Sequence, residues 1–261
     1  MTGQIRFPQR GWLFDLDGTV YLGEALIPGA DVTIATLRAD GRRVAFLSNK
    51  PLETGSDYAR KLTRLGIPTG GDAVITSSLV LARHLATLDP GAPVFVIGEP
   101  PLIAELAAHG FETRSDHRVR WVVIAFDRTF DYAKLNTALQ AVRGGARLIA
   151  TNPDRTCPTA EGEIPDCAGM IAAVEAVTGQ TVEVVVGKPS SIILDVALRT
   201  LGVTAGECVI VGDRLETDIV MGKRCGLTTV LVLSGVTRPD DPRIAEIDPD
   251  AVLPSIRELI G

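Results

Sequence analysis

The sequence predicts an α/β fold in which parallel strands alternate with helices. Short runs of apolar and β-branched residues recur along the 261 residues, and amphipathic stretches of helical length separate them. Several of these stretches are followed by a glycine, which readily takes the left-handed conformation at the end of a helix. Such alternation is typical of βαβ units, whose parallel sheet is covered by helices on both faces.

Nine runs are predicted to be strands because each holds four to six consecutive, mostly apolar residues. In order they are Trp12–Asp15, Val44–Ser48, Ala73–Thr76, Pro93–Ile97, Trp121–Phe126, Arg147–Ala150, Val182–Val186, Cys208–Gly212 and Thr229–Leu233. Eight longer stretches repeat their apolar residues at helical spacing. They are Gly29–Asp40, Glu53–Leu65, Ser78–Leu88, Pro101–His109, Tyr132–Val142, Gly169–Thr178, Ser190–Leu201 and Thr217–Cys225.

The composition argues against several functional classes. The chain carries 26 Lys and Arg against 32 Asp and Glu, and this net charge of −6 does not suit a protein that binds the nucleic-acid backbone. No apolar run approaches the roughly 20 residues that span a bilayer, and the first residues lack the apolar segment of a secretory signal. The four cysteines lack metal-site spacing, so we expect reduced thiols. We therefore expect a cytoplasmic protein whose partners are neither nucleic acids nor membranes.

Two aspartates follow the first predicted strand. Asp15 ends the apolar run, and Asp17 comes just before a turn at Gly18. Ligands of a parallel sheet bind beyond the carboxyl ends of its strands, where both carboxylates would lie. Two carboxylates so close repel each other, and a cation between them removes the repulsion. Hard oxygen ligands favour Mg²⁺, although an isolated pair of this kind is more often a strand end followed by an Asp-Gly turn.

Three other strand ends carry polar residues that suit an anion or a metal ion. Ser48 and Asn49 follow the second predicted strand and offer a hydroxyl and backbone amides. Lys188 follows the seventh, beside the start of a helix, and Asp213 and Asp218 follow the eighth. Each residue alone is usually a helix cap or a solvated loop residue. Together they indicate a site that holds Mg²⁺ and a phosphate.

These residues resemble the motifs of the haloacid dehalogenase-like (HAD) superfamily. The matching motifs are Asp15-Leu16-Asp17-Gly18-Thr19, then Ser48, then Lys188, then Gly212-Asp213-Arg214-Leu215-Glu216-Thr217-Asp218. The resemblance covers nearly the whole chain and extends to the NagD-like branch, subfamily IIA, which includes sugar-phosphate and 4-nitrophenyl-phosphate phosphatases. It implies a Rossmann-like core with a parallel sheet and an inserted α/β cap domain of the C2 type.

The resemblance also implies roles for the acidic residues. Asp15 would be the nucleophile that attacks phosphorus and forms an aspartyl-phosphate. Asp17 would protonate the leaving alkoxide and then accept a proton from the hydrolytic water. Mg²⁺ would be held by the Asp15 side chain, the Asp17 backbone carbonyl and Asp213, while Asp218 would orient these ligands from behind.

The same resemblance implies a phosphate site. Ser48, the backbone amide of Asn49 and Lys188 would bind the phosphoryl oxygens and align the group for transfer. Many relatives have a Thr-Asn-Asn sequence where this chain has Ser48-Asn49-Lys50. The serine keeps the hydroxyl, and Lys50 adds a cation that either contacts an anionic substrate or pairs with Glu53.

The spacing between the motifs predicts where a second domain is inserted. Asp17 and Ser48 are 31 positions apart, and Lys188 and Asp213 are 25 positions apart. Each interval therefore has room for little more than one helix. Ser48 and Lys188 are 140 positions apart, far more than one βα unit needs. We expect residues 1–77 and 182–261 to form the catalytic core and residues 78–181 to form a small α/β cap. Such a cap would close over the site and exclude bulk water.

One segment of the predicted cap resembles the specificity loop of NagD-like proteins. It runs from Ala150 to Pro158, and its candidates for substrate contact are Asn152, Asp154 and Arg155. The alternative is an ordinary surface loop that is rich in turn-forming residues. Because relatives often pair through their caps, the resemblance also implies a homodimer as a candidate assembly.

The sequence predicts a Mg²⁺-dependent phosphatase that hydrolyses small phosphomonoesters, such as sugar phosphates, through an aspartyl-phosphate. One alternative is a phosphotransferase or phosphomutase of the same fold, although the sugar mutases usually carry their cap after the first motif, where this chain has no room for it. A second alternative, a non-catalytic module that binds a phosphorylated metabolite, predicts the loss of Asp15 or Asp17, and both are present. The physiological substrate is not predicted.

Overall fold

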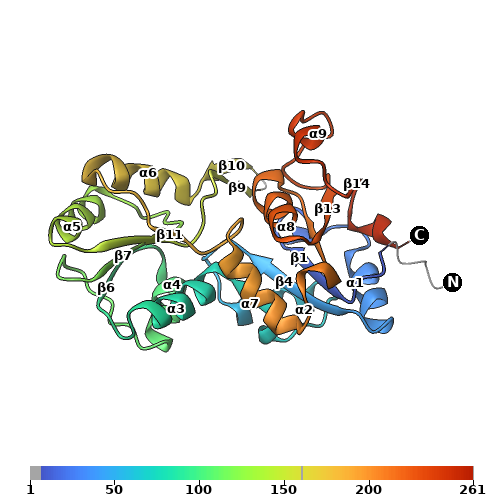
Figure 1. Ribbon diagram of the computed structural model, residues 1–261, viewed down its shortest axis with the longest axis horizontal. Helices are drawn as coiled ribbons and strands as arrows, with labels where there is room; N and C mark the ends of the chain where they lie inside the picture. Colours follow the sequence, from blue (N-terminus) through green and yellow to red (C-terminus); the bar gives the residue numbers. More distant parts are fainter. Residues whose placement is uncertain (1–6, 160, 261) are drawn as a thin grey trace.

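A six-stranded parallel sheet forms the centre of the larger part of the chain (Figure 1). The computed structural model describes residues 7–159 and 161–260. The strands are ordered β14-β13-β12-β1-β4-β5, and each neighbouring pair is parallel. Their bounds are β1 (Gly11–Asp15), β4 (Arg43–Ser48), β5 (Val74–Thr76), β12 (Cys208–Gly212), β13 (Thr228–Val232) and β14 (Ala251–Leu253).

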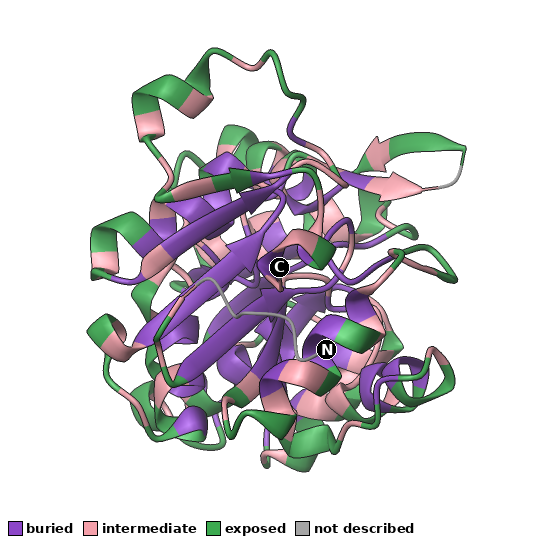
Figure 2. Ribbon diagram, turned by 90° about the vertical axis from the view of Figure 1, so that its right-hand side faces the viewer, coloured by how far each residue is buried: buried purple, intermediate pink, exposed green. Residues whose placement is uncertain are grey.

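Helices cover both faces of this sheet because its strands are apolar on both faces. Trp12 and Phe14 of β1 pack into one apolar cluster, and Leu13 between them packs into another. In Figure 2 these strands are purple, or buried, and lie between helices whose outer sides are exposed. The first cluster includes residues of α1 (Ala30–Ala39) and α2 (Gly55–Arg64), and the second includes residues of α7 (Ser191–Leu201) and α8 (Val220–Cys225). Strands buried on both faces are typical of parallel sheets.

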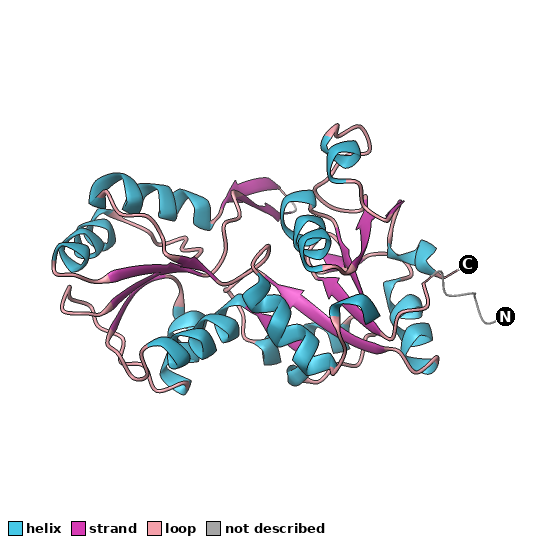
Figure 3. Ribbon diagram, viewed as in Figure 1, coloured by secondary structure: helices cyan, strands magenta, loops and turns pink. Residues whose placement is uncertain are grey.

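A second parallel sheet, of four strands, lies beside the first (Figure 3). Its order is β11-β8-β7-β6. The strands are β6 (Val94–Ile97), β7 (Trp121–Ile124), β8 (Arg147–Ala150) and β11 (Val184–Val185), and the helices against them are α4 (Pro100–Ala108), α5 (Tyr132–Arg143) and α6 (Cys167–Thr178). The two sheets confirm the predicted α/β fold with an added α/β cap. The boundaries of the cap stay a prediction, and β11 pairs with β8 although it lies just after the range 78–181.

One apolar cluster joins the two sheets. It contains Leu13 and Leu47 from the six-stranded sheet and Val94 and Trp121 from the four-stranded sheet. Helix α3 (Ser77–Leu88) connects them, because it contacts both α4 and α7. In Figure 1 this helix lies below the four-stranded sheet, on the side of α7. The two parts of the chain therefore share a continuous core.

Several elements differ from the sequence-based expectation. The segment after β8, which we expected to be a loop, contains an antiparallel hairpin of β9 (Thr156–Thr159) and β10 (Gly162–Pro165). The predicted helix 217–225 begins instead as a π-helical turn, η3 (Leu215–Ile219), before α8. Elements without a predicted counterpart are β2 (Tyr21–Leu22), β3 (Ala25–Leu26), α9 (Arg243–Ile247), β14 and the 3₁₀ turns η1 (Gly71–Ala73), η2 (Ala205–Glu207) and η4 (Ile256–Leu259).

Two expectations about the whole chain can be compared with the structure. Within residues 7–159 and 161–260, no helix combines the length and apolar character that crossing a membrane requires. The four cysteines are free thiols, as their spacing predicted.

Candidate active site

The site lies at the carboxyl end of the six-stranded sheet, where ligands of parallel sheets bind. Asp15 is the last residue of β1, Ser48 is the last residue of β4, and Asp213 follows β12 directly. These residues are neighbours because β1 pairs with β12 on one side and with β4 on the other. Lys188 comes from the segment between β11 and α7. The structure thus brings together the four strand ends that the sequence singled out.

Three carboxylates form a buried acidic cluster beside these strand ends. Asp15, Asp213 and Asp218 each offer an oxygen, and these oxygens lie within 4.8 Å of one another. Burial raises the pKa of Asp213 well above its usual value, and the charges of Asp15 and Asp218 raise it further. A divalent cation among these oxygens would remove the repulsion, and carboxylates are ligands that Mg²⁺ prefers. The donor set therefore fits a hard divalent metal ion.

Glycines let the backbone approach this cluster closely. A Cβ added at Gly235 would lie 2.0 Å from Oδ2 of Asp213, and one added at Gly18 would lie 2.5 Å from the same atom. Gly18 also has a φ of +87°, which favours glycine. The Asp213 carboxylate is held in this space by the backbone N–H of Val236, which donates to it at 2.7 Å. The site thus requires glycine on two sides of one candidate metal ligand.

Lys188 is buried between two carboxylates of the cluster. Its ammonium group donates hydrogen bonds to Asp15 and, at 2.7 Å, to Oδ1 of Asp218. Burial alone would lower the pKa of Lys188, but the charges of Asp15 and Asp218 raise it above its ordinary value. The same contacts oppose the effect of burial on Asp218, whose pKa is raised to about 6. The lysine therefore stays charged and offers a cation to an anionic group that binds beside Asp15.

A small cavity of about 40 Å³ opens beside this cluster. The residues that line it are Asp15, Asp17, Ser48, Asn49, Lys50, Asp154, Cys157, Pro158, Asp166, Lys188, Arg214 and Thr217. Asp213 and Asp218 are not among them. Burial raises the pKa of Asp17, Lys50 opposes this shift, and Asp15 adds to it. A raised pKa helps a carboxyl group to carry a proton at neutral pH.

The side chain of Asn49 fixes the segment that carries Lys188. Its Oδ1 accepts a hydrogen bond from the backbone N–H of Lys188 at 2.8 Å, and its Nδ2 donates to the carbonyl of Lys188 at 3.0 Å. The hydroxyl of Ser48 accepts a hydrogen bond from the backbone N–H of Lys50 at 3.2 Å. The sequence predicts a part in phosphate binding only for the backbone amide of Asn49. The positioning of Lys188 is an additional contact that the sequence does not reveal.

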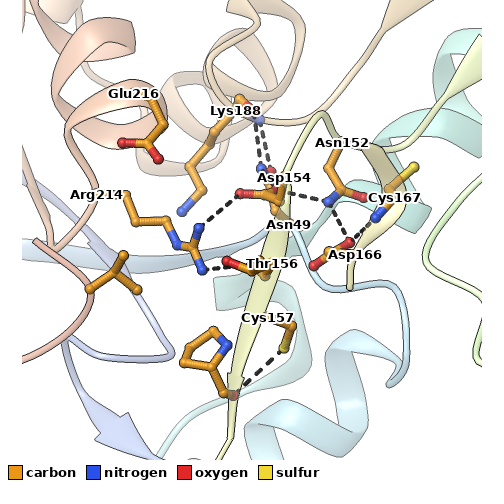
Figure 4. A network of polar contacts seen from close by, with 12 residues as sticks. Asn49, Asn152, Asp154, Thr156, Cys157, Asp166, Cys167, Lys188, Arg214 and Glu216 are labelled. Atoms are coloured by element: carbon orange, nitrogen blue, oxygen red, sulfur yellow. Dashed lines mark hydrogen bonds and ion pairs between the residues drawn. The ribbon is translucent and has the colours of Figure 1, made fainter. Parts of the chain in front are cut away.

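The three candidate substrate contacts of the predicted cap lie in different surroundings. Asp154 lines the cavity and is buried. Asn152 is fully buried and donates to the carboxylates of Asp154 and Asp166, at 2.7 and 3.1 Å (Figure 4). Arg155 is exposed. Neither Asn152 nor Arg155 is among the lining residues, so of the three only Asp154 faces the cavity.

Several lining residues were missed in the sequence. Arg214 and Thr217 lie within the motif that supplies Asp213 and Asp218, but only the carboxylates of that motif suggested chemistry. Arg214 donates to the carbonyl oxygen of Thr156 at 2.9 Å. Thr217 has a buried hydroxyl without a hydrogen-bond partner among the residues that the structure describes. The signal that could have found them is their position between Asp213 and Asp218, which the sequence pattern singled out.

Lys50 faces the cavity. The ion pairs found in residues 7–159 and 161–260 do not include one between Lys50 and Glu53. Burial alone would lower the pKa of Lys50, but the charge of Asp17 and the neighbouring Cys157 raise it. Of the two alternatives for Lys50, this placement favours contact with an anionic substrate.

A parallel α/β core, an added cap and an acidic cluster beside a lysine are features of the haloacid dehalogenase-like hydrolases. The family model described as haloacid dehalogenase-like hydrolase matches residues 12–112, and a second, described as HAD-hydrolase-like, matches residues 185–259. The chain is 41% identical over 250 residues to the sugar-phosphatase AraL of Bacillus subtilis, covering 95% of this chain and 91% of that protein.

Solved structures agree with this comparison. The p-nitrophenyl phosphatase from Archaeoglobus fulgidus is 34% identical with a TM-score of 0.90, covering 96% of this chain and 98% of that one. NagD from Escherichia coli K-12 is 33% identical with a TM-score of 0.86, covering 97% of this chain and 98% of that one. The chain therefore belongs to the haloacid dehalogenase-like hydrolases. Within them it is a NagD-like phosphatase, as its motifs predicted.

Proposed function

We propose that this chain hydrolyses small phosphomonoesters, in particular sugar phosphates, with Mg²⁺ and through an aspartyl-phosphate on Asp15. The observation that carries the proposal is the placement of the Asp15 carboxylate. It lies at the end of a buried strand, in contact with the ammonium group of Lys188 and within 4.8 Å of two further carboxylates. The relatives named for sugar phosphates and for p-nitrophenyl phosphate support this substrate class.

The reaction that this arrangement supports has two steps. First, a carboxylate oxygen of Asp15 forms a bond to phosphorus while the ester P–O bond breaks, and Asp17 gives its proton to the leaving alkoxide. Second, water attacks the phosphorus of the aspartyl-phosphate and gives a proton to Asp17. Inorganic phosphate leaves, and Asp15 returns as a carboxylate. The raised pKa of Asp17 suits a group that is protonated before the first step.

The phosphoryl group would be held by groups that this chain already positions. Lys188, kept in place by Asn49, supplies a positive charge, and Ser48 and the backbone amide of Asn49 supply hydrogen-bond donors. Mg²⁺ would be held by Asp15, Asp213 and the backbone carbonyl of Asp17, and it would neutralise negative charge on the phosphoryl oxygens. Asp218 would orient the set from behind.

The proposal is tested by phosphate release from p-nitrophenyl phosphate with Mg²⁺. We expect Asp15→Asn to lower kcat by at least about 10³-fold, because the amide is no nucleophile, and we expect EDTA to abolish turnover. Asp240→Asn, at an exposed position, is the matched control and should keep full activity. Near-full activity of Asp15→Asn would show that the nucleophile lies elsewhere, and activity that survives EDTA would reject the metal.

The proposal extends to the cap, the oligomeric state and the cellular compartment of the enzyme. We propose that residues 78–181 act as the cap, that two chains pair through their caps, and that the enzyme works in the cytoplasm. The four free thiols suit a reducing compartment. Light scattering on the protein as it elutes from a size-exclusion column would measure the molar mass of the assembly. The mass of a monomer at micromolar concentration would contradict the pairing.

A further inference from the structure

The carboxylate of Asp154 lies at a junction between the two sheets. Asp154 belongs to the segment between β8 and β9, yet its Oδ2 accepts a hydrogen bond from Nδ2 of Asn49, next to β4, at 2.8 Å. The same oxygen accepts a hydrogen bond from Asn152 at 2.7 Å, and Oδ1 faces a guanidinium nitrogen of Arg214 at 3.8 Å. Figure 4 shows this carboxylate between Asn49 and Arg214. Asp154 is only 8% exposed, and its Oδ2 already accepts two hydrogen bonds from side chains of the protein.

Both partners of Asp154 from the core also position residues of the proposed catalytic site. Asn49 holds the backbone of Lys188 through two hydrogen bonds. Arg214 follows Asp213 directly, and its backbone N–H donates to Oδ2 of Asp218 at 3.3 Å. One carboxylate from the cap segment thus contacts the two side chains that adjoin the lysine and the acidic cluster.

Arg214 makes a second connection to the same segment. Its guanidinium group donates to the carbonyl oxygen of Thr156 at 2.9 Å, and Thr156 is the first residue of β9. The contacts of Arg214 with Asp154 and Thr156 therefore hold the start of the β9–β10 hairpin against the core. Cys157 and Pro158, the next two residues of β9, line the cavity.

The hairpin forms part of the wall of the cavity, which is partly open to solvent. The volume of the cavity is about 40 Å³, which corresponds to a few waters, because one water requires about 10–15 Å³. Since Cys157 and Pro158 line it, the position of the hairpin sets the space that is left for a phosphomonoester. A hairpin held against the core also helps to exclude water during transfer. The contacts of Asp154 and Arg214 are the ones that fix this position.

We propose that Asp154 is a positioning residue that latches the β9–β10 hairpin onto the core through Arg214 and Asn49, and that it does not contact the substrate. This latch rests on the proposed function, because it holds the hairpin and the core in the arrangement in which Lys188 and the acidic cluster are positioned for phosphoryl transfer. It is the alternative to our prediction that Asp154 contacts the substrate.

The test compares Asp154→Asn, Arg214→Met and the double variant. Asparagine can still accept a hydrogen bond from Asn49 but loses the charge that faces Arg214, and methionine keeps the length of Arg214 without its donors. Arg128→Met is the matched control, because Arg128 pairs with Glu99 inside the cap and leaves the core untouched. Folding is checked for each variant by its thermal midpoint.

Three readouts measure the latch. We expect each single variant to lower kcat/KM about tenfold, equivalent to about 1.4 kcal/mol, by the same factor for p-nitrophenyl phosphate and for sugar phosphates. We expect the double variant to be no worse than Arg214→Met alone, because Arg214→Met already breaks the contact with Asp154 together with the hydrogen bond to Thr156. We expect hydrogen exchange of the amides of β9 and β10 to accelerate about tenfold in these variants and to stay unchanged in Arg128→Met.

Other results would overturn the latch. Losses that differ between leaving groups, or that multiply in the double variant, would make Asp154 a substrate contact. Hydrogen exchange in β9 and β10 that stays at the wild-type rate would remove the latch altogether. If the wild-type protein releases no phosphate, the proposed function fails, but the exchange measurement still decides whether Asp154 and Arg214 hold the hairpin.

Discussion

The close packing of Gly235 against Asp213 makes a sharp prediction about the acidic cluster. An alanine Cβ at position 235 would lie 2.0 Å from Oδ2, 2.5 Å from Cγ and 2.7 Å from Cβ of Asp213. Gly235 is not among the glycines with positive φ, so its backbone accepts alanine without strain. The perturbation is therefore confined to one methyl group pressed against one carboxylate.

The size of the displacement follows from these distances. A contact of 2.0 Å must lengthen to at least 3.0 Å, so the carboxylate of Asp213 has to move by about 1 Å, a displacement that can cost about 10²-fold in rate at a catalytic site. Asp213 is fully buried and cannot move away toward solvent. We expect Gly235→Ala to lower kcat about 100-fold and to raise the Mg²⁺ concentration needed for half-maximal activity.

The assay is p-nitrophenyl phosphate hydrolysis across a Mg²⁺ titration. The control is Gly169→Ala in α6, because a Cβ at Gly169 meets no atom within 4 Å, and alanine should stabilise that helix by up to about 1 kcal/mol. A Gly235→Ala enzyme with wild-type kcat and wild-type Mg²⁺ dependence would refute the assignment of Asp213 to the metal site. A circular dichroism spectrum identical to that of the wild type would show that the loss is local.

Three further predictions concern residues of the cavity. Thr217→Val should lower kcat/KM about three- to tenfold, because it removes a buried hydroxyl that has no partner among the described residues and is therefore free to bind the substrate. Urea unfolding should show no loss of stability, and a loss would mean that the hydroxyl is bonded within the protein. Lys50→Met should raise KM for anionic esters about tenfold with a smaller effect on kcat, and an unchanged KM in steady-state assays would place Lys50 outside the substrate site. Burial and the charge of Asp154 raise the pKa of Asp166 from 3.8 to about 6, so between these values the folded chain binds a proton that the unfolded chain lacks. The contribution of Asp166 to stability therefore falls as the pH rises through this window; Asp166→Asn should raise the free energy of unfolding by about 1–3 kcal/mol at pH 8 and by less at pH 5, and an equal change at both pH values in urea titrations would contradict this.

The strands that carry the site could be predicted because their sequence pattern is strong. Phe14 and Leu47 belong to unbroken apolar runs, and a polar residue follows each run where the strand leaves the sheet. The carboxyl ends of parallel strands meet at one edge, so the polar residues were expected to lie together. Helices that end at glycine were located to within a few residues, because a glycine after the last helical turn is also a strong sequence signal.

The β9–β10 hairpin could not be predicted in this way. Thr156–Thr159 contains a proline and only one strongly apolar residue, so it lacks the pattern of a buried strand. Its structure depends on pairing with β10 and on the contact of Arg214 with Thr156, which lie 58 positions apart. The role of Asn49 was missed for a similar reason, because its side chain acts on a segment 139 positions away. Contacts of this kind leave no local signal in the sequence.

The order of the strands sets a condition on how the chain folds during synthesis. Strand β1 lies between β4 and β12, so one edge of β1 has no partner until Cys208–Gly212 leaves the ribosome. At roughly 5–20 residues per second, the intervening roughly 190 residues take about 10–40 s. An apolar strand with an open edge invites pairing with other chains. We therefore expect nascent chains of this enzyme that stop before β12 to aggregate or to bind chaperones, while full-length chains close the sheet and escape both.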